Sequence, residues 1–367
     1  MVLMGEKDRI NSIVHKSELS ARDIYFLLSL GDSEDIKFLG EQAYAVKKEH
    51  VSNKVYFRGL IEFSNICSKD CLYCGIRRSN DSPERFLMTK QEILDAAMFA
   101  YTNRYGSVVL QSGERTDITF TDFVCELVRS IKTETGGKLG VTLSCGEQNP
   151  ETYRMFFKAG AHRYLLRIET SDRELYGKLH PRDRHHDFDN RLSCLRSLKE
   201  TGFQVGTGVM VGLPFQTIAH LVSDLLFLKE IDADMVGLGP YIEHSQTPLY
   251  LHRDQLWPQQ ERLTMTLKMI AVLRIMMNDI NIASATALQA IDGFGRERAL
   301  KFGANIIMPN LTPREHRKDY LLYEDKPCIE EDREECKDCL EIRIRLTGDE
   351  IGYDTWGDSR HFINRNH

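Results

Sequence analysis

Three cysteines, Cys67, Cys71 and Cys74, lie within eight residues of this 367-residue chain, in the segment CSKDCLYC. A closed structural zinc site takes four ligands, and this segment offers three with no further Cys or His close by. A disulfide would leave one thiol over, and packing alone does not require three neighbouring cysteines. A 4Fe-4S cluster held by three thiolates keeps one iron open for another molecule. The spacing therefore favours such a cluster over zinc, and either metal over packing.

A second group of three cysteines lies near the end of the chain, in the acidic segment CIEEDREECKDC. The group consists of Cys328, Cys336 and Cys339. Three ligands at this spacing suit a peripheral 4Fe-4S or 2Fe-2S cluster whose fourth ligand is not cysteine, and zinc is the alternative. Of the other cysteines, Cys125 and Cys194 are expected to pack on apolar helix faces. Cys145, beside a strand end, has two alternatives: it reaches the cavity, or, as is more common for such a residue, it is inert.

Short apolar runs alternate with amphipathic stretches from residue 54 onward, which indicates strands alternating with helices. The eight runs are KVYFRGLIEFS, SVVLQSGE, LGVTLSCGE, RYLLRIET, FQVGTGVMVGLP, ADMVGLGPYI, NIASATAL and ANIIMPN. Apolar strands with helices between them form parallel sheets that are covered on both faces. Eight units predict a (β/α)8 TIM-type barrel, with its active site where the strands end. An open doubly wound sheet is the alternative, but no GxGxxG motif follows the first strand.

The predicted α/β chain has three parts. Residues 1–50 are expected to form an N-terminal helical cap, residues 51–320 the barrel, and residues 321–367 a C-terminal extension with the second cysteine group. In the cap, Ser17 or Ser20 is a plausible helix start. The first cysteine group follows the first predicted strand, so it is expected at the catalytic mouth of the barrel.

The composition excludes several classes of protein. A net charge of −6 argues against a nucleic-acid partner. No apolar run approaches the length of a membrane span, and no signal-peptide h-region follows the first residues. Nine cysteines, six of them in two groups of three, suggest metal binding rather than a disulfide framework. We expect a cytoplasmic protein without a membrane partner.

The spacing Cys-x3-Cys-x2-Cys, with the aromatic Tyr73 before the last cysteine, resembles the radical S-adenosylmethionine (radical SAM) superfamily. In that superfamily, the open iron of a 4Fe-4S cluster binds the amino and carboxylate groups of SAM. One electron from the reduced cluster then cleaves SAM into methionine and a 5′-deoxyadenosyl radical. A barrel that orients and shields this radical suits the chemistry. The resemblance thus implies an enzyme that uses a 4Fe-4S cluster and SAM.

Further motifs follow in the order typical of that superfamily. The segment Gln111-Ser112-Gly113-Glu114 resembles the GGE element that receives the SAM amino group, with Ser112 in place of the first glycine. The other residues that the resemblance assigns to the SAM site are Glu169, Arg191, Met210 and Met235. Ordinary explanations exist, since Glu169 could cap a helix and Arg191 could be a surface arginine. Their order after Cys74 favours the cofactor site.

Longer segments, among them RGLIEFSNICSKDCLYCGIRRSN and ANIIMPNLTP, resemble the FeFe-hydrogenase maturases of the HydE type, from about residue 20 to about residue 345. The resemblance implies that the adenosyl radical attacks the sulfur of a cysteine-bound iron carbonyl-cyanide precursor of the hydrogenase active site. It assigns to the substrate side Arg58, Thr142, Arg163, Thr286 and Tyr320. Ile168 stands where the family often has His, and Ala285 where relatives can have Thr.

Arg58 and Arg163 are expected at inward-facing strand positions. Such interior arginines need anionic partners, and a substrate carboxylate or cyanide would supply them. For Arg163, an ion pair with Glu169 or a neighbouring acid is the alternative. The expected partners are a small-molecule or organometallic substrate, an electron donor of the ferredoxin or flavodoxin type, and other hydrogenase maturases.

Three other functions stay open. They are a sulfur insertion like that of biotin synthase, a mutase reaction like that of methylornithine synthase, and a cluster-carrying scaffold without turnover. Biotin synthase requires additional barrel cysteines, and no set of three can be completed around Cys145, which disfavours the first of them.

Overall fold

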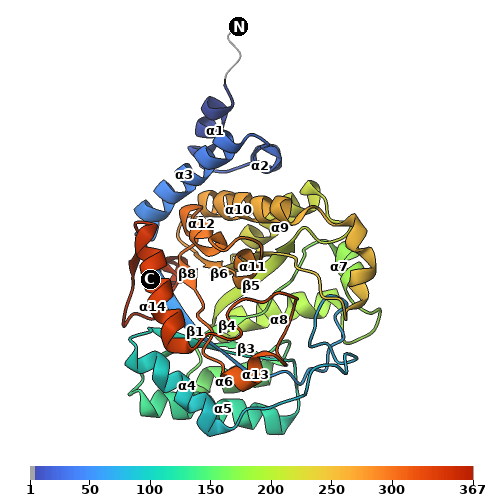
Figure 1. The fold of residues 1–367 in the computed structure, drawn as a ribbon, viewed down its shortest axis with the longest axis vertical. Coiled ribbons are helices and arrows are strands. Elements are labelled where there is room, and N and C mark those ends of the chain that lie inside the picture. Colours follow the sequence, from blue (N-terminus) through green and yellow to red (C-terminus); the bar gives the residue numbers. More distant parts are fainter. Residues whose placement is uncertain (1–4, 367) are drawn as a thin grey trace.

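The computed structural model describes residues 5–366, apart from the Cys336 side chain, and contains a closed barrel of eight parallel strands (Figure 1). The strands run in chain order, and β1 pairs with both β8 and β2, which closes the barrel. The predicted (β/α)8 fold is therefore confirmed, and the open doubly wound sheet is excluded. The strands are β1 (Lys54–Ser64), β2 (Ser107–Ser112), β3 (Gly140–Ser144), β4 (Arg163–Leu165), β5 (Gln204–Val211), β6 (Met235–Pro240), β7 (Asn281–Ser284) and β8 (Ile306–Ile307).

Helices surround the barrel, and many begin at a polar cap. Thr89 and Thr217 form capping boxes, and Gly202 ends α8 in the left-handed conformation at φ 101°. The helices that follow the strands are α4 (Lys90–Thr102), α5 (Ile118–Glu134), α6 (Pro150–Ala159), α7 (Arg173–Leu179), α8 (Phe188–Thr201), α9 (Ile218–Glu230), α10 (Gln259–Met276), α11 (Thr286–Ile291) and α12 (Gly295–Lys301). The 3₁₀ helix η1 (Pro248–Gln255) and the short α13 (Arg314–Arg317) lie in loops. Thr286 was expected on the seventh strand but begins α11.

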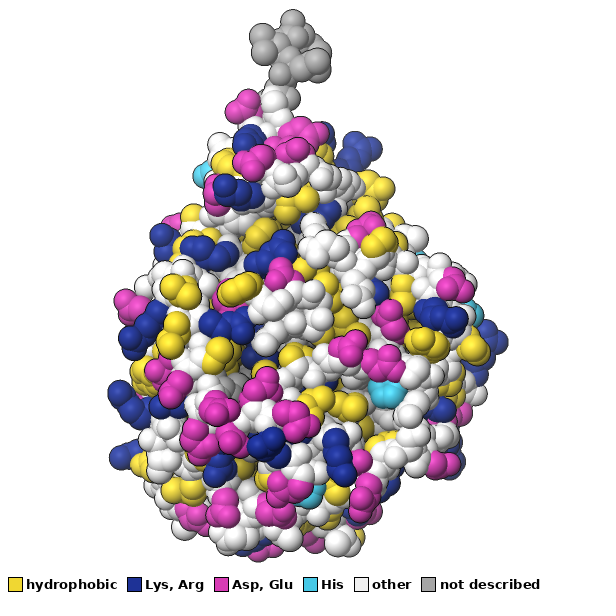
Figure 2. All heavy atoms as spheres, viewed as in Figure 1, with side chains coloured by type: hydrophobic (Ala, Val, Ile, Leu, Met, Phe, Trp, Pro, Cys, Tyr) yellow, Lys and Arg dark blue, Asp and Glu magenta, His cyan; other side chains and the backbone are white. Residues whose placement is uncertain are grey.

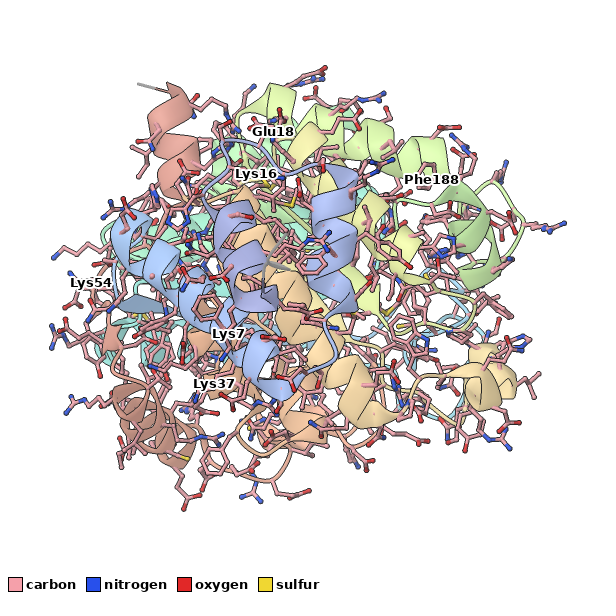
Figure 3. The ribbon with its side chains drawn as sticks, turned by 90° about the horizontal axis from the view of Figure 1, so that it is seen from above. Lys7, Lys16, Glu18, Lys37, Lys54 and Phe188 are labelled. Carbon is pink, nitrogen blue, oxygen red and sulfur yellow. The ribbon has the colours of Figure 1, made fainter. Side chains whose placement is uncertain are left out.

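Three N-terminal helices pack on the outside of the barrel, at the top of Figure 1. They are α1 (Glu6–Val14), α2 (Ala21–Ser29) and α3 (Ser33–His50). Ser20 caps α2, as one of the two predicted starts. Leu27, Leu28 and Leu39 are fully buried where α2 and α3 meet α9 and α10. Figure 3 looks down on these helices and labels Glu18, whose carboxylate pairs with Lys229 of α9 at 2.6 Å.

The C-terminal residues close the end of the barrel at which the strands begin. β9 (Glu350–Ile351), which adds to the start of β1, and α15 (Arg360–Asn366) lie at this end. α14 (Arg333–Leu346) precedes them on the outside of the barrel, where Arg343 pairs with Glu297 of α12. The segment 356–361, called the floor segment, lies across the barrel interior. Arg58 and Asn281 donate to the carbonyl of Gly357 at 3.0 and 2.8 Å, and Arg163 donates to that of Trp356 at 2.9 Å.

The outer surface carries both signs of charge. Figure 2 shows Lys and Arg side chains interspersed with Asp and Glu over the face seen in Figure 1. Among residues 5–366, no helix combines the length and the apolar character needed to cross a membrane.

Candidate active site

The first three cysteines lie on a loop that follows β1, residues 65–78, called the cluster loop. Asn65 anchors its start by donating to the carbonyls of Glu84 and Asp319, at 2.7 and 2.8 Å. The end of β2 approaches this loop closely, since a Cβ on Gly113 would lie 2.4 Å from the carbonyl oxygen of Ile66. Only glycine permits this approach. As a result, the backbone N–H of Glu114 donates to Cys67 Sγ at 3.3 Å.

The environment of the three thiols fits a metal cluster. Burial raises the pKa of the Cys67, Cys71 and Cys74 thiols, that of Cys71 to about 12. The negative charge of a neighbouring cysteine or acid raises each of these pKa values further. Buried thiols near one another become thiolates only when a cation binds them. The backbone N–H at Cys67 Sγ favours the thiolate form. Three such ligands on one cavity wall suit a 4Fe-4S cluster with one open iron.

A buried group of charged residues lies beside the cluster loop. Lys69 pairs with Glu114 at 3.2 Å and with Glu147 at 3.0 Å. Arg191 donates through Nε to Glu147 and through a terminal nitrogen to the carbonyl of Arg167 at 2.6 Å. Burial raises the pKa of Glu114, whereas Arg191 and Lys69 keep that of Glu147 low against its burial. The predicted SAM ligands Glu114 and Arg191 thus belong to one network, through Lys69 and Glu147.

Glu169 follows β4 in a strained backbone conformation. Its φ is +67°, a region that side chains other than glycine rarely adopt. The backbone of β5 holds it there, because Glu169 N–H donates to Gly208 at 2.9 Å and Met210 N–H donates back at 3.1 Å. Arg167 Nε donates to both carboxylate oxygens of Glu169, at 2.9 and 3.0 Å. Arg167 and Glu169 both line the same cavity.

A cavity of about 380 Å³ occupies the end of the barrel at which the strands finish. Most of the predicted site residues line it. They are Cys67, Cys71, Tyr73, Cys74, Gln111, Ser112, Gly113, Glu114, Glu169, Arg191, Met210, Thr286 and Tyr320. Tyr73 is also held by His180, whose Nε2 lies 3.4 Å from the phenol oxygen. Ser144 of β3 and Gly239 of β6 line the cavity as well, so that residues of strands β1 to β7 and of the loops that follow the strands meet in one space, as a barrel active site requires.

Several residues of the cavity wall carry no sequence motif. The segment 319–326, called the strap, lines the cavity and contributes Tyr323 and Lys326 beside the predicted Tyr320. Lys326 is buried and pairs with Glu62 of β1 at 2.6 Å, while Gln111 donates to the Tyr320 hydroxyl at 3.3 Å. The sequence held one indication that Glu62 belongs to the site, which is that an acidic residue interrupts the apolar run of the first strand. Lys326 lies in a loop of mixed polarity, and no pattern in the sequence indicated that it belongs to the site.

Four predicted residues lie elsewhere. Arg58, Thr142 and Met235 line a separate space of about 20 Å³, the size of one water, between the large cavity and the floor segment. Arg163 is fully buried and donates to Thr142 at 2.9 Å and to Asp358 at 2.5 Å. Its anionic partner is therefore Asp358 of the floor segment, whereas Glu169 pairs with Arg167. The structure does not bring these four to the large cavity.

The second cysteine group lies around α14. Cys328 precedes the helix with φ +64° and its carbonyl accepts from Arg317 at 3.0 Å, while Cys339 is exposed on the helix. The Cys336 side chain falls outside the described residues, so a second cluster stays a prediction. Cys125 and Cys194 are buried in the core, as expected. Cys145 is buried as well, with its sulfur against the carbonyl of Leu110.

Comparison with known proteins agrees with this geometry. The model of the radical SAM superfamily matches residues 61–228. The FeFe-hydrogenase maturase subunit HydE of Thermotoga maritima is 44% identical over 91% of this chain and 92% of its own length. A 3-methylornithine synthase of Methanosarcina acetivorans is 28% identical over 90% of this chain and 89% of its own length.

Solved structures show the same architecture. Methylornithine synthase superposes with a TM-score of 0.79 at 26% identity, over 95% of this chain and 98% of the other. The FeFe-hydrogenase maturase HydG of Carboxydothermus hydrogenoformans reaches 0.79 at 18% identity, over 98% and 82%, which supports the fold alone. The chain therefore belongs to the radical SAM superfamily and, within it, to the FeFe-hydrogenase maturases of the HydE type, which implies an enzyme with a 4Fe-4S cluster and SAM.

Proposed function

We propose that the protein reductively cleaves SAM and directs the 5′-deoxyadenosyl radical to a cysteine-derived iron carbonyl-cyanide precursor, in the maturation of the hydrogenase active site. The observation that carries the proposal is one cavity of about 380 Å³ whose wall holds Cys67, Cys71 and Cys74 beside Glu114 and Glu169. A radical source and a small substrate share this space, shielded from water by strand ends and loops. When bound, the cluster supplies the electron that breaks SAM, and SAM supplies the radical.

The residues of the buried network hold SAM in this proposal. The Glu114 carboxylate accepts from the SAM ammonium, and Lys69 and the Glu147 N–H, at 3.2 and 2.8 Å, keep it in place. Arg191 has two nitrogens engaged by Glu147 and Arg167, and we assign its third to the SAM carboxylate. The strained backbone at Glu169 presents its carboxylate to the same ligand. Met210, from β5, contributes an apolar wall for the adenosyl group.

Arg167, Thr286 and Tyr320 form the substrate end. Arg167 is partly exposed, at 29% of its side chain, and donates through Nη2 to the carbonyl of Val209 at 2.9 Å. A guanidinium fixed in this way and turned to a cavity receives an anionic group, here the carboxylate of the cysteine moiety. Thr286 and Tyr320 add hydroxyl groups to the same wall. The buried Arg58, Thr142, Arg163 and Met235 shape the far end of the interior, behind the substrate.

Five further features belong to the proposal. A protein of the ferredoxin or flavodoxin type supplies the electron, and other hydrogenase maturases act before and after this enzyme. A second iron–sulfur cluster, 4Fe-4S or 2Fe-2S, is held by Cys328, Cys336 and Cys339. The enzyme works in the cytoplasm. Residues 1–50, 51–320 and 321–367 act as cap, catalytic barrel and extension.

Product analysis tests the function directly. Anaerobic reconstituted protein is given SAM, dithionite and an iron carbonyl-cyanide cysteine complex, and the products are separated by mass spectrometry. We expect an adduct in which the adenosyl group is linked to the sulfur of the complex. Cys71→Ala should make neither this adduct nor 5′-deoxyadenosine. Recovery of unchanged complex beside uncoupled 5′-deoxyadenosine from the wild type would reject the substrate, and 5′-deoxyadenosine from the Cys71 variant would reject the cluster assignment.

A further inference from the structure

Two loops meet on the outer side of the cysteines. One is the cluster loop, and the other is the cover loop, residues 180–186, which follows α7. The N–H of Asp70 donates to His186 Nε2 at 2.9 Å, and Lys69 donates to the carbonyl of His185. Just before the cover loop, the carbonyl of Leu179 accepts from the N–H of Leu72 at 2.9 Å. The cover loop is therefore fastened to the middle of the Cys-x3-Cys-x2-Cys segment.

Unpaired positive charge collects on these two loops. Arg78, Arg182 and Arg184 are exposed, and within residues 5–366 none of the three forms an ion pair. Arg78 lies beside the contact between the loops, because its N–H donates to the carbonyl of Lys69 at 2.8 Å. The carboxylates of the two loops are engaged. Asp70 pairs with Arg77 at 2.8 Å, and Asp183 accepts from His186 at 2.7 Å.

This local charge runs against the rest of the molecule. The chain has a net charge of −6, and an acidic protein repels acidic partners over most of its surface. The exposed arginines Arg78, Arg182 and Arg184 belong to the loop that carries the cysteines and to the loop fastened to it, and in the cysteine segment itself Ser68 is exposed and Cys67 is half-buried. A negatively charged partner is attracted to this place and is oriented there.

We propose that Arg78, Arg182 and Arg184 form the docking surface for an acidic one-electron carrier protein. The inference rests on the proposed function, because a carrier is needed only if the cysteines hold a cluster that must be reduced. Docking at this surface brings the redox centre of the carrier against the cluster loop. The arginines bind the partner and do not touch SAM or substrate, so they affect delivery of electrons and leave the chemistry of the cavity unchanged.

Direct binding is the primary test. The triple variant Arg78→Glu, Arg182→Glu and Arg184→Glu is reconstituted and titrated with an acidic ferredoxin by calorimetry at low ionic strength. We expect the dissociation constant to rise about tenfold or more, and the salt dependence of the remaining binding to flatten. Matching melting temperatures establish that the variant is folded. Binding equal to that of the wild type would overturn the proposal.

A charge-matched control separates the surface from the net charge. Lys7→Glu, Lys37→Glu and Lys54→Glu change the net charge by the same amount, and Figure 3 shows these three lysines apart from Phe188, which lies two residues beyond the cover loop. All three are exposed. We expect this control to bind the ferredoxin as the wild type does. An equal loss of binding in the control would show that net charge alone explains the weaker binding, and would reject the three arginines as a docking surface.

Activity distinguishes this inference from the proposed function. With reduced ferredoxin as donor, the arginine variant should form 5′-deoxyadenosine at least fivefold more slowly, whereas dithionite should drive both proteins equally. An equal loss with dithionite would place the arginines in the catalytic machinery and contradict the docking role. If the wild type forms no 5′-deoxyadenosine even with dithionite, the proposed function fails, while the calorimetric result still decides whether the surface binds an acidic protein.

Discussion

Lys326 donates to both carboxylate oxygens of Glu62, at 2.6 and 2.7 Å, and thereby fastens the strap to the first strand of the barrel. Lys326 also donates to the carbonyl of Tyr320 at 3.0 Å, and Asn310 donates to Glu62 at 3.2 Å. Both charged side chains are almost fully buried in the cavity wall. Replacing a buried ion pair by apolar residues is often neutral or stabilising, so such a pair is weak evidence for a role in stability. We infer that the Lys326–Glu62 pair serves to hold the strap in position.

Substitution of Lys326 by Met should leave the Glu62 carboxylate buried without its cation. We expect the free energy of unfolding to fall by about 3–5 kcal/mol. Since the strap carries Tyr320, adduct formation should fall more than SAM cleavage, so more 5′-deoxyadenosine is released per adduct. The exposed pair Lys90–Glu126 is the control, because Lys90→Met should cost less than about 1 kcal/mol.

The double variant Glu62→Gln, Lys326→Met decides between a fastening and a purely energetic role. Removal of both charges should recover most of the stability, because no unpaired charge remains. The ratio of adduct to 5′-deoxyadenosine should stay low, since the strap is still unfastened. A double variant that recovers both quantities would contradict a positioning role for the pair.

Local patterns in the sequence were sufficient to predict the barrel and the cluster loop. β1 was expected at residues 54–64 and lies there, because its apolar run is long and ends at polar residues. The cysteine spacing needs only the geometry of one loop. Strands four and eight are much shorter than their apolar runs, with three and two residues, and beyond each of them the chain returns to a neighbouring strand only at an isolated bridge, from Glu169 to Val209 and from Asn310 to Leu60. Such departures serve the site and have no periodicity of their own.

Pairings between distant segments were beyond what the sequence could predict. Arg163 was expected to meet a substrate anion or a nearby acid, and its partner Asp358 lies 195 residues further along the chain. Lys326 and Glu62 are 264 residues apart. One sequence carries no information on which of many charged residues meet. By contrast, Glu114, Glu169 and Arg191 were found because the motif of a known superfamily supplies that long-range information.

Gly75, directly after Cys74, lies where the cluster loop touches two other loops. A Cβ at this position would lie 2.0 Å from the carbonyl oxygen of Leu321 and 2.6 Å from the ring of His244. Gly75→Ala should therefore displace the cluster loop from the strap. We expect iron binding after reconstitution to fall at least twofold and SAM cleavage to fall further. Gly177→Ala, in α7 with open space around it, is the control and should retain iron. Full iron content in Gly75→Ala would show that the loop tolerates the shift.

Glu147 holds three donors in the network beside the cysteines. Lys69 and Asn190 donate to one carboxylate oxygen at 3.0 and 2.6 Å, and Arg191 donates to the other. Glu147→Gln leaves two buried cations facing one carboxylate, so we expect a loss of about 3–5 kcal/mol in stability. Because Arg191 is then less firmly held, the dissociation constant for SAM should rise at least tenfold in equilibrium binding. Glu151→Gln, in an exposed pair with Arg154, should leave both quantities nearly unchanged. Normal SAM affinity in Glu147→Gln would remove Glu147 from the cofactor site.

His361 ties the start of α15 to the loops that precede β6 and β7. Its two ring nitrogens meet Asp279 at 3.0 Å and Asp232 at 2.5 Å. The hydrogen bond to Asp279 and then that to Asp232 raise the pKa of His361 to about 9, from an ordinary value near 6.5. The pKa of Asp232 is lowered to about 2 by Lys199 and His361 against its burial, and that of Asp279 is lowered by His361 as well. Since both pKa values lie below that of an ordinary aspartate, both acids are charged over the pH range in which His361 titrates.

The stabilisation by His361 should depend on pH in a defined direction. Because the folded state binds the proton more tightly than the unfolded state, the contribution is complete below about pH 6.5 and is lost as the pH rises through about 9. At pH 6 it should amount to about 1–2 kcal/mol, after allowance for solvent screening. The lysines Lys47, Lys132 and Lys268, with pKa values lowered to about 8 by burial, titrate in the same range.

The melting temperature of the wild type alone therefore cannot isolate His361, but its difference from His361→Gln can. The buried lysines are present in both proteins, so their titration cancels in the difference. We expect the wild type to melt several degrees above the variant at pH 6, and the gap to close between pH 7 and pH 9.5. A gap that stays constant over this range would mean that His361 is held by packing and neutral hydrogen bonds. A gap that widens with pH would contradict the raised pKa itself, because only a group that loses its proton more easily on folding gains stability at high pH.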